Sequence, residues 1–240
     1  MDLLEIESLD HINLDHWYYQ SKFNIFKREL KHVPQQQSLI DVGAGSAIFS
    51  HLFLKNTTFN QATAFDINYK NNKIISVYND KKLAYAKEMT GFSADLILMM
   101  DILEHIEDDA TFLKNIVNQA NKGTIFFISV PAFQSIFSLH DDYLKHYRRY
   151  NKSQLNRLVL DANLQPVSIF YGFYTLFLPV VIGRILKNII YKSRDGAPKS
   201  DMNASPNLTI NSFLKCCHKH EPFIKNPLFG LTCFCVAKNK

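Results

Sequence analysis

A turn built around two glycines is the most informative chemical feature of the sequence. Residues 39–42 are apolar apart from Asp41, and Gly43 and Gly45 follow ahead of small residues that lead into a helix. Glycine lets the backbone turn sharply and approach a ligand closely, while the N-terminus of the following helix favours an anionic group. Ala47 stands where a third glycine would complete a pyrophosphate loop, so the turn favours a carboxylate or another anion.

Acidic residues also end two further apolar segments. Asp66 follows the second segment, with Ile67 after it, and Met100 and Asp101 end the fourth. A carboxylate at the position of Asp66 can accept hydrogen bonds from both hydroxyls of a ribose, or it can cap a turn. Because the carboxyl ends of parallel strands meet at one edge of a sheet, we expect these residues to lie close to the glycine turn.

Several ionisable residues follow the fifth apolar segment, and five of them are candidates for chemistry, namely His140, Asp141, His146, Arg148 and Arg149. Histidine titrates near neutrality, so His140 or His146 can serve as a general base; the alternative is that both only anchor their loop. Arginine binds phosphate and carboxylate groups bidentately, or one of the two arginines pairs with a neighbouring aspartate. We take Asp141, Arg148 and Arg149 as candidates for substrate binding.

Alternating strands and helices must position these residues. The predicted strands are residues 39–42, 62–65, 83–86, 95–100, 124–130, 166–173 and 231–237. The predicted helices are residues 47–55, 110–120, 151–163, 175–191 and 208–218, with a helical lead-in over 1–34 and a loop over 193–207. This alternation indicates a parallel sheet covered by helices on both faces, that is, a doubly wound α/β fold whose ligands bind at the carboxyl ends of the strands.

Composition limits the classes of function. The chain has 240 residues, enough for one substantial domain, with 47% hydrophobic and 20% charged residues and a net charge of +5. We expect no nucleic-acid partner, because no basic stripe is interleaved with aromatic side chains. The N-terminus lacks the pattern of a secretory signal, and the four cysteines have no metal-type spacing, so we expect buried free thiols and a cytoplasmic location.

An uncharged stretch at residues 162–183 raises the question of a membrane. Two prolines and a glycine interrupt it, and Arg184, Lys187 and Lys192 follow. Three alternatives remain for the predicted helix at 175–191: a buried helix, an interfacial helix whose cations reach lipid headgroups, and a transmembrane span.

The order of these motifs resembles that of class I S-adenosylmethionine-dependent methyltransferases over nearly the whole chain. Residues 101–105 match the sequence aspartate-x-leucine-glutamate-histidine that follows the fourth strand in a bacterial branch of that class. The aromatic run at 16–19 with Lys22 is similar to the lead-in of that branch, and residues 130–132 and 140–150 are similar to its fifth strand end and the following segment.

The resemblance implies a Rossmann-like seven-stranded sheet in the order 3-2-1-4-5-7-6. It implies a single domain over 1–240, with a lead-in at 1–34, a cofactor-binding core at 35–130 and an acceptor-side segment at 131–240. The implied cofactor is S-adenosyl-L-methionine, bound by Lys22, Asp41, Gly43, Gly45, Asp66, Ile67, Met100 and Asp101. Asp101, Glu104 and His105 also resemble the set that binds a divalent ion in ubiquinone O-methyltransferases. Relatives that are not thought to use a metal have the same sequence motif, so we expect no metal.

We therefore predict O-methylation of a saccharide or lipid-linked acceptor of the cell envelope, by a cytoplasmic enzyme that works in solution or at the inner face of the membrane. One alternative is an NAD(P)-dependent oxidoreductase on a Rossmann sheet. Another is a non-catalytic, cofactor-binding module at the membrane surface. The sequence leaves the acceptor's identity, the atom that is methylated and the oligomeric state open.

Overall fold

One mixed sheet of eight strands forms the centre of the structure. Its strands are β1 (Ser38–Val42), β2 (Gln61–Phe65), β3 (Lys73–Val77), β4 (Lys81–Ala86), β5 (Leu96–Met100), β6 (Ile125–Pro131), β7 (Leu164–Gly172) and β8 (Thr232–Asn239). The computed structural model describes residues 13–33, 37–89, 91–191 and 207–240, with only the backbone of 185–191. The first part of the lead-in and nearly all of the predicted loop at 193–207 therefore lie outside the described residues.

The strands lie in the order β3-β4-β2-β1-β5-β6-β8-β7. The pairs that join β4, β2, β1, β5 and β6 are parallel, whereas β8 is antiparallel to both β6 and β7. Without β3 this is the order 3-2-1-4-5-7-6 that the resemblance implies, so the expected fold class is confirmed.

The eighth strand, β3, corrects the expected count of seven. It pairs antiparallel with β4 at the edge of the sheet, and the turn between them places Tyr78, Asn79 and Asp80 at φ values of 44°, 63° and 64°. Its side chains are half exposed or exposed, and Ile74 is 73% exposed. An edge strand with so little buried surface lacks the apolar pattern by which the other strands were recognised.

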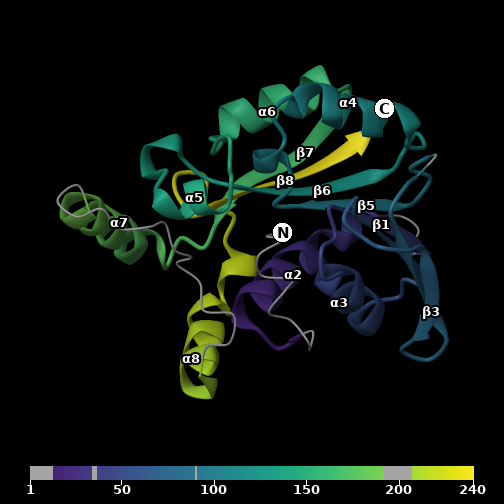
Figure 1. The fold of residues 1–240 in the computed structure, drawn as a ribbon, viewed down its shortest axis with the longest axis horizontal. Coiled ribbons are helices and arrows are strands. Elements are labelled where there is room, and N and C mark those ends of the chain that lie inside the picture. The colour runs from purple at the N-terminus through teal and green to yellow at the C-terminus, as the bar shows by residue number, and fades with distance from the viewer. Residues whose placement is uncertain (1–12, 34–36, 90, 192–206) are drawn as a thin grey trace.

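Helices cover both faces of the sheet, with α2 and α3 on one face and α4 and α6 on the other (Figure 1). The helices are α2 (Trp17–Glu29), α3 (Ile48–Asn56), α4 (Asp109–Gln119), α5 (Leu139–Tyr143), α6 (Lys152–Asp161), α7 (Phe177–Tyr191) and α8 (Leu208–His218). The completely buried β5 serves both cores, because Leu96 and Leu98 join the α2–α3 side while Ile97 and Met99 join the other. α6 begins with a capping box between Asn151 and Gln154.

The last two helices extend away from the sheet, at the lower left of Figure 1. The bounds of α8 are those predicted, and α7 begins two residues later than predicted. Among the residues that the structure describes, no helix has the length and apolar character needed to cross a membrane. The cysteines are free thiols as expected; Cys233 and Cys235 are buried in β8, but Cys216 on α8 is exposed, which corrects the expectation that all are buried.

Candidate active site

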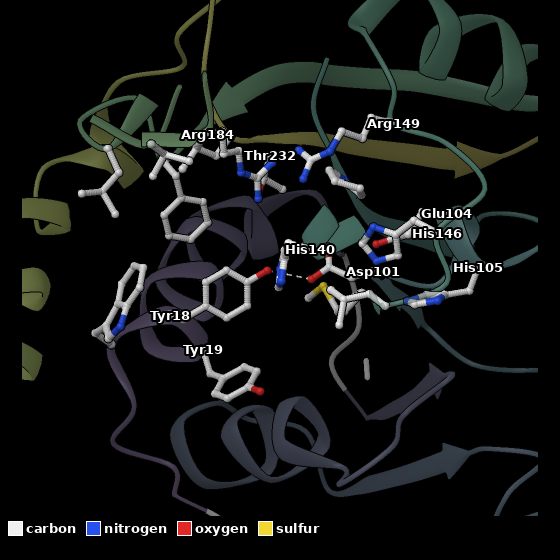
Figure 2. Close-up of a pocket in the computed structure, with 18 of the residues that line it drawn as sticks. Tyr18, Tyr19, Asp101, Glu104, His105, His140, His146, Arg149, Arg184 and Thr232 are labelled. Carbon is white, nitrogen blue, oxygen red and sulfur yellow. Dashed lines mark hydrogen bonds between the residues drawn. The ribbon is translucent and has the colours of Figure 1, made fainter. Parts of the chain in front are cut away.

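A cavity of about 410 Å³ opens at the carboxyl ends of β5 and β6 (Figure 2). Its apolar wall comes from α2 and from the segment that enters α7, and includes Trp17, Tyr18, Phe173, Leu176 and Val180. Its ionisable groups are Asp101, Glu104, His105, His140, His146, Arg149 and Arg184. Five of the predicted site residues therefore meet in one place, namely Met100, Asp101, His140, His146 and Arg149.

Asp101 is anchored where β5 ends, with its backbone at a φ of 53°. Its carboxylate accepts hydrogen bonds from the Tyr18 hydroxyl at 2.9 Å and the Ser129 hydroxyl at 3.0 Å, and it pairs with the fully buried ammonium of Lys22. Burial alone would raise the pKa of Asp101, but the charge and hydrogen bond of Lys22, together with the hydrogen bond from Tyr18, outweigh it and hold the pKa below its ordinary value. Lys22, which we expected to bind a cofactor directly, reaches Asp101 instead and keeps it ionised.

Glu104 lies in the short helix η2 (Leu103–His105) and is 1% exposed. Burial, and after it the negative charge of Asp101, raise its pKa to about 8. Its Oε2 atom is buried and has no hydrogen-bond partner among the described residues. At neutral pH Glu104 is therefore mainly a protonated acid, which can donate a hydrogen bond as well as accept one.

His146 and Asp141 form a buried pair close to Glu104 and His105. The Nδ1 atom of His146 lies 3.0 Å from Oδ1 of Asp141, whose other oxygen accepts the backbone N–H of Ser138 at the start of α5. An ionised carboxylate only accepts hydrogen bonds, so Nδ1 is the nitrogen of His146 that carries a proton, and in a neutral ring Nε2 is the unprotonated one. The Nε2 atom is then left as the acceptor, which is the form that a general base requires.

Two arginines share the same carboxylate. The Nε of Arg149 donates to Oδ1 of Asp141 at 2.7 Å, and the Nη1 of Arg184 lies 3.7 Å from Oδ2. Burial alone would raise the pKa of Asp141, but the bonds from His146 and the two arginines keep it well below its ordinary value. Asp141 thus organises the basic side of the cavity, and the structure gives it no direct role toward an acceptor.

The glycine turn lies beside this cavity at the ends of β1 and β2. The N–H of Gly43 bonds to the carbonyl of Phe65, and its φ is +68°; a Cβ at this position would lie 2.4 Å from a side-chain carbon of Ile102. Asp41 is buried and accepts both the N–H and the hydroxyl of Ser50, and burial raises its pKa to about 6. Glycine is therefore required at position 43, and Asp41 ties the turn to α3.

Asp66 ends β2 and holds the same turn from the other side. It accepts the N–H of Gly45 at 2.9 Å, and its second oxygen accepts the N–H and side-chain amide of Asn68. These are the contacts of a turn-capping aspartate, and they use three of the roughly four acceptor positions of a carboxylate. Ile67, also expected to bind the cofactor, is 70% exposed.

Three side chains that line the cavity form what we call the acid–histidine cluster, namely Glu104, His105 and His146. Their ligand atoms all lie within 4.8 Å of one another, so they could hold a divalent cation. This set differs from the one weighed from the sequence: Asp101 is engaged by Lys22 and Tyr18, and His146 takes its place. Burial lowers the pKa of His105 to about 3, which keeps the ring neutral.

The structure places Arg148, a predicted substrate-binding residue, outside the cavity, and it adds Arg184 and Tyr18, which the sequence did not predict. Arg148 pairs with Asp109 at 2.9 Å and does not line the cavity. Arg184 was considered only as a lipid-facing cation, yet it lines the cavity and donates to the carbonyl of Ile136 at 2.9 Å. The sequence feature that could have indicated Arg184 is its position as the first charged residue after a long uncharged stretch. For Tyr18 the only such feature is its membership of the aromatic run at 16–19.

Comparison of sequences identifies the family. A profile described as a methyltransferase domain matches residues 14–169, which is more than half of the chain and includes the glycine turn, Asp66, Asp101 and His146. The chain belongs to this methyltransferase domain family. A comparison with curated proteins gives no match.

Solved methyltransferase structures share the fold. A SAM-dependent methyltransferase from Archaeoglobus fulgidus aligns with a TM-score of 0.51 and 16% identity over 89% of this chain and 90% of that one. A proposed sarcosine dimethylglycine methyltransferase from Galdieria sulphuraria gives 0.55 and 12% over 92% and 85%. Haemonchus contortus phosphoethanolamine N-methyltransferase 2, in complex with phosphomonomethylethanolamine and S-adenosylhomocysteine, gives 0.51 and 14% over 92% and 53%. The expected methyltransferase class and its cofactor, S-adenosyl-L-methionine, are confirmed, and the specific bacterial branch stays a prediction.

The residues present fit that cofactor. The turn at Gly43 has no room for a Cβ and brings bare backbone to the sheet edge, and Asp66 retains acceptor capacity beside it. Met100 and Asp101 line the cavity at the next strand end. When bound, S-adenosyl-L-methionine supplies the reactive methyl group, and the chain supplies alignment and exclusion of water.

Proposed function

We propose that this methyltransferase methylates an oxygen atom of a saccharide or lipid-linked acceptor of the cell envelope. The observation that carries the proposal is the His146–Asp141 pair, in which Nδ1 of His146 lies 3.0 Å from the Asp141 carboxylate at a cavity next to the cofactor-binding strand ends. A hydroxyl acceptor needs such a base, because its proton must leave as the new bond to carbon forms. The apolar wall suits a partly apolar acceptor.

In this proposal each side chain has a distinct task. The Nε2 of His146 accepts the proton of the acceptor hydroxyl, and the Asp141 carboxylate stabilises the imidazolium that results. Glu104, as a protonated acid, donates a hydrogen bond to an acceptor oxygen. Arg149 and Arg184 fix Asp141 in place and contribute positive charge to that wall.

His140 is the second candidate for the base. It lines the cavity and is 9% exposed, whereas the buried carboxylate of Asp141 orients the ring of His146. We therefore favour His146 and assign His140 to acceptor positioning. Ile67 and Arg148 are left out of the proposed binding set because of their positions. The division into a lead-in, a cofactor core and an acceptor-side segment remains part of the proposal, as does a cytoplasmic site of action at the inner membrane face.

The direct test offers methyl-labelled cofactor and purified protein to cell-envelope extracts and determines the mass of any labelled product. His146→Ala should lower turnover by roughly 10²–10⁴-fold, the usual contribution of a general base, with binding of S-adenosylhomocysteine unchanged by calorimetry. The exposed His220 provides the matched control, since His220→Ala removes an imidazole that does not line the cavity. Turnover that survives His146→Ala nearly intact would show that His146 is not the base.

The same measurements address the alternatives. The family match sets aside an NAD(P)-dependent oxidoreductase. A non-catalytic module would bind S-adenosylhomocysteine yet label no envelope fraction.

A further inference from the structure

The segment between α8 and β8 displays large apolar side chains to solvent. Phe223 is 68% exposed and Leu228 is 73% exposed, and Ile224 and Phe229 between and beside them are exposed as well. Single exposed apolar side chains are ordinary, but four within seven consecutive residues form a patch that calls for an explanation. We call the segment that carries them, residues 223–229, the apolar loop.

The backbone of the apolar loop is firmly held. Its centre, Asn226, accepts the N–H of Tyr171 at 2.8 Å through its carbonyl and the N–H of Leu228 at 2.9 Å through its side chain. Arg28 donates to the carbonyl of Pro222 at 2.8 Å and its guanidinium stacks 4.1 Å above the Phe223 ring. The exposed side chains are therefore presented by a fixed scaffold.

The apolar loop is continuous with the two helices that extend from the sheet. The rings of Phe229 and Phe177 lie 5.4 Å apart, which joins the loop to the start of α7, where Leu178 and Ile182 are exposed. On the other side the loop follows α8, where Phe213 is 66% exposed. β7 leads into α7 and the loop leads into β8 at the same end of the sheet as the cavity (Figure 1).

A second hollow, whose charged side chains are mainly cationic, is lined in part by Phe223. This cationic hollow has a volume of about 460 Å³ and lies between α2 and α8. Its charged lining consists of Lys27, Arg28, Lys215, Lys219, the single acid Asp15 and the imidazole of His218. Asp15 pairs with Lys215, so the hollow keeps an excess of positive charge. A hollow of this charge favours phosphate-bearing groups.

We propose that the apolar loop and the cationic hollow together dock the enzyme on an anionic lipid bilayer. Phe223 and Leu228 enter the boundary between headgroups and acyl chains, and the lysines and Arg28 contact headgroup phosphates. A lipid surface fits better than a protein partner, because lysine is depleted at protein–protein interfaces whereas aromatic tips flanked by lysines are typical of membrane interfaces. The inference deepens the membrane-face location proposed above, and its test needs no methyl transfer.

The test is flotation of the purified full-length protein with vesicles. Vesicles of phosphatidylglycerol and phosphatidylethanolamine should carry the protein upward, and vesicles of phosphatidylcholine alone should carry much less. The double variant Phe223→Ser/Leu228→Ser should lower the bound fraction about tenfold or more. Lys27→Glu/Lys219→Glu should abolish the preference for the anionic vesicles, and salt should weaken binding by the wild type.

The matched control is Ile74→Ser, which removes an equally exposed apolar side chain from β3 at the far edge of the sheet. It should float like the wild type. Because all the substituted side chains are at the surface, thermal unfolding should verify that each variant is folded. Equal flotation of the Phe223→Ser/Leu228→Ser variant and the wild type would overturn the proposal. So would a dimer in sedimentation analysis that dissociates in this variant while vesicle binding is absent, since the face would then bind a second copy of the chain.

Discussion

Replacing Glu104 by glutamine should make the protein more stable at alkaline pH. The ordinary pKa of glutamate is 4.5 and burial raises that of Glu104 to about 8. Between these pH values the folded protein keeps a proton that the unfolded chain releases, so the stability of the wild type falls as the pH rises and the loss is complete above pH 8. At about 1.36 kcal/mol per pKa unit, the ceiling of this loss is roughly 5 kcal/mol.

Glutamine has nearly the same shape but does not ionise, so Glu104→Gln removes this loss. The assay is urea unfolding at several values between about pH 4.5 and pH 9, with a chelator present so that no cation binds the carboxylate. The stability of the variant relative to the wild type should increase by several kcal/mol across this range. Glu107→Gln, an exposed neighbour three positions along the chain, is the control and should leave the pH dependence unchanged. Parallel curves for Glu104→Gln and the wild type would refute the reasoning.

Three further outcomes follow from the site. Lys22→Met should destabilise the protein by about 3–5 kcal/mol in urea unfolding, because it strands the Asp101 carboxylate, and adding Asp101→Asn should recover much of that loss. Gly43→Ala should weaken binding of S-adenosylhomocysteine in calorimetry, because its Cβ meets Ile102 and its φ is positive, whereas Gly91→Ala, where a Cβ meets nothing within 4 Å, should not. Exhaustive chelation should leave turnover unchanged; a loss that a divalent cation restores would instead assign the acid–histidine cluster to metal binding.

The sequence predicted most of the fold because its central strands are buried on both faces. β5 and β6 are nearly continuous apolar runs, and such runs are recognisable without knowledge of their partners. The edge strand β3 has mostly exposed side chains and owes its place to pairing with β4, which no local pattern reveals. The turn at Asn79 and Asp80 was the available signal, since both residues tolerate a positive φ.

The site was predictable only where chemistry follows a strand end. Met100 and Asp101 fall at such an end, so parallel topology alone brings them to the cavity. Arg148 and Arg149 are adjacent in sequence, yet Arg149 turns to Asp141 and Arg148 to Asp109, and sequence cannot choose between them. The contact of Arg184 with Asp141 spans more than forty residues and depends on how α7 lies against α5.

The shared carboxylate of Asp141 also connects His146 with α7. It holds His146 through one oxygen, while Arg184, carried by α7, lies near the other. The position of α7 therefore sets how much negative charge remains for the imidazole, and coupling of this kind acts equally in both directions. In the proposed mechanism, a surface that displaced α7 would change proton transfer to His146. By the same coupling, an acceptor hydrogen-bonded to His146 would change the affinity of α7 for that surface.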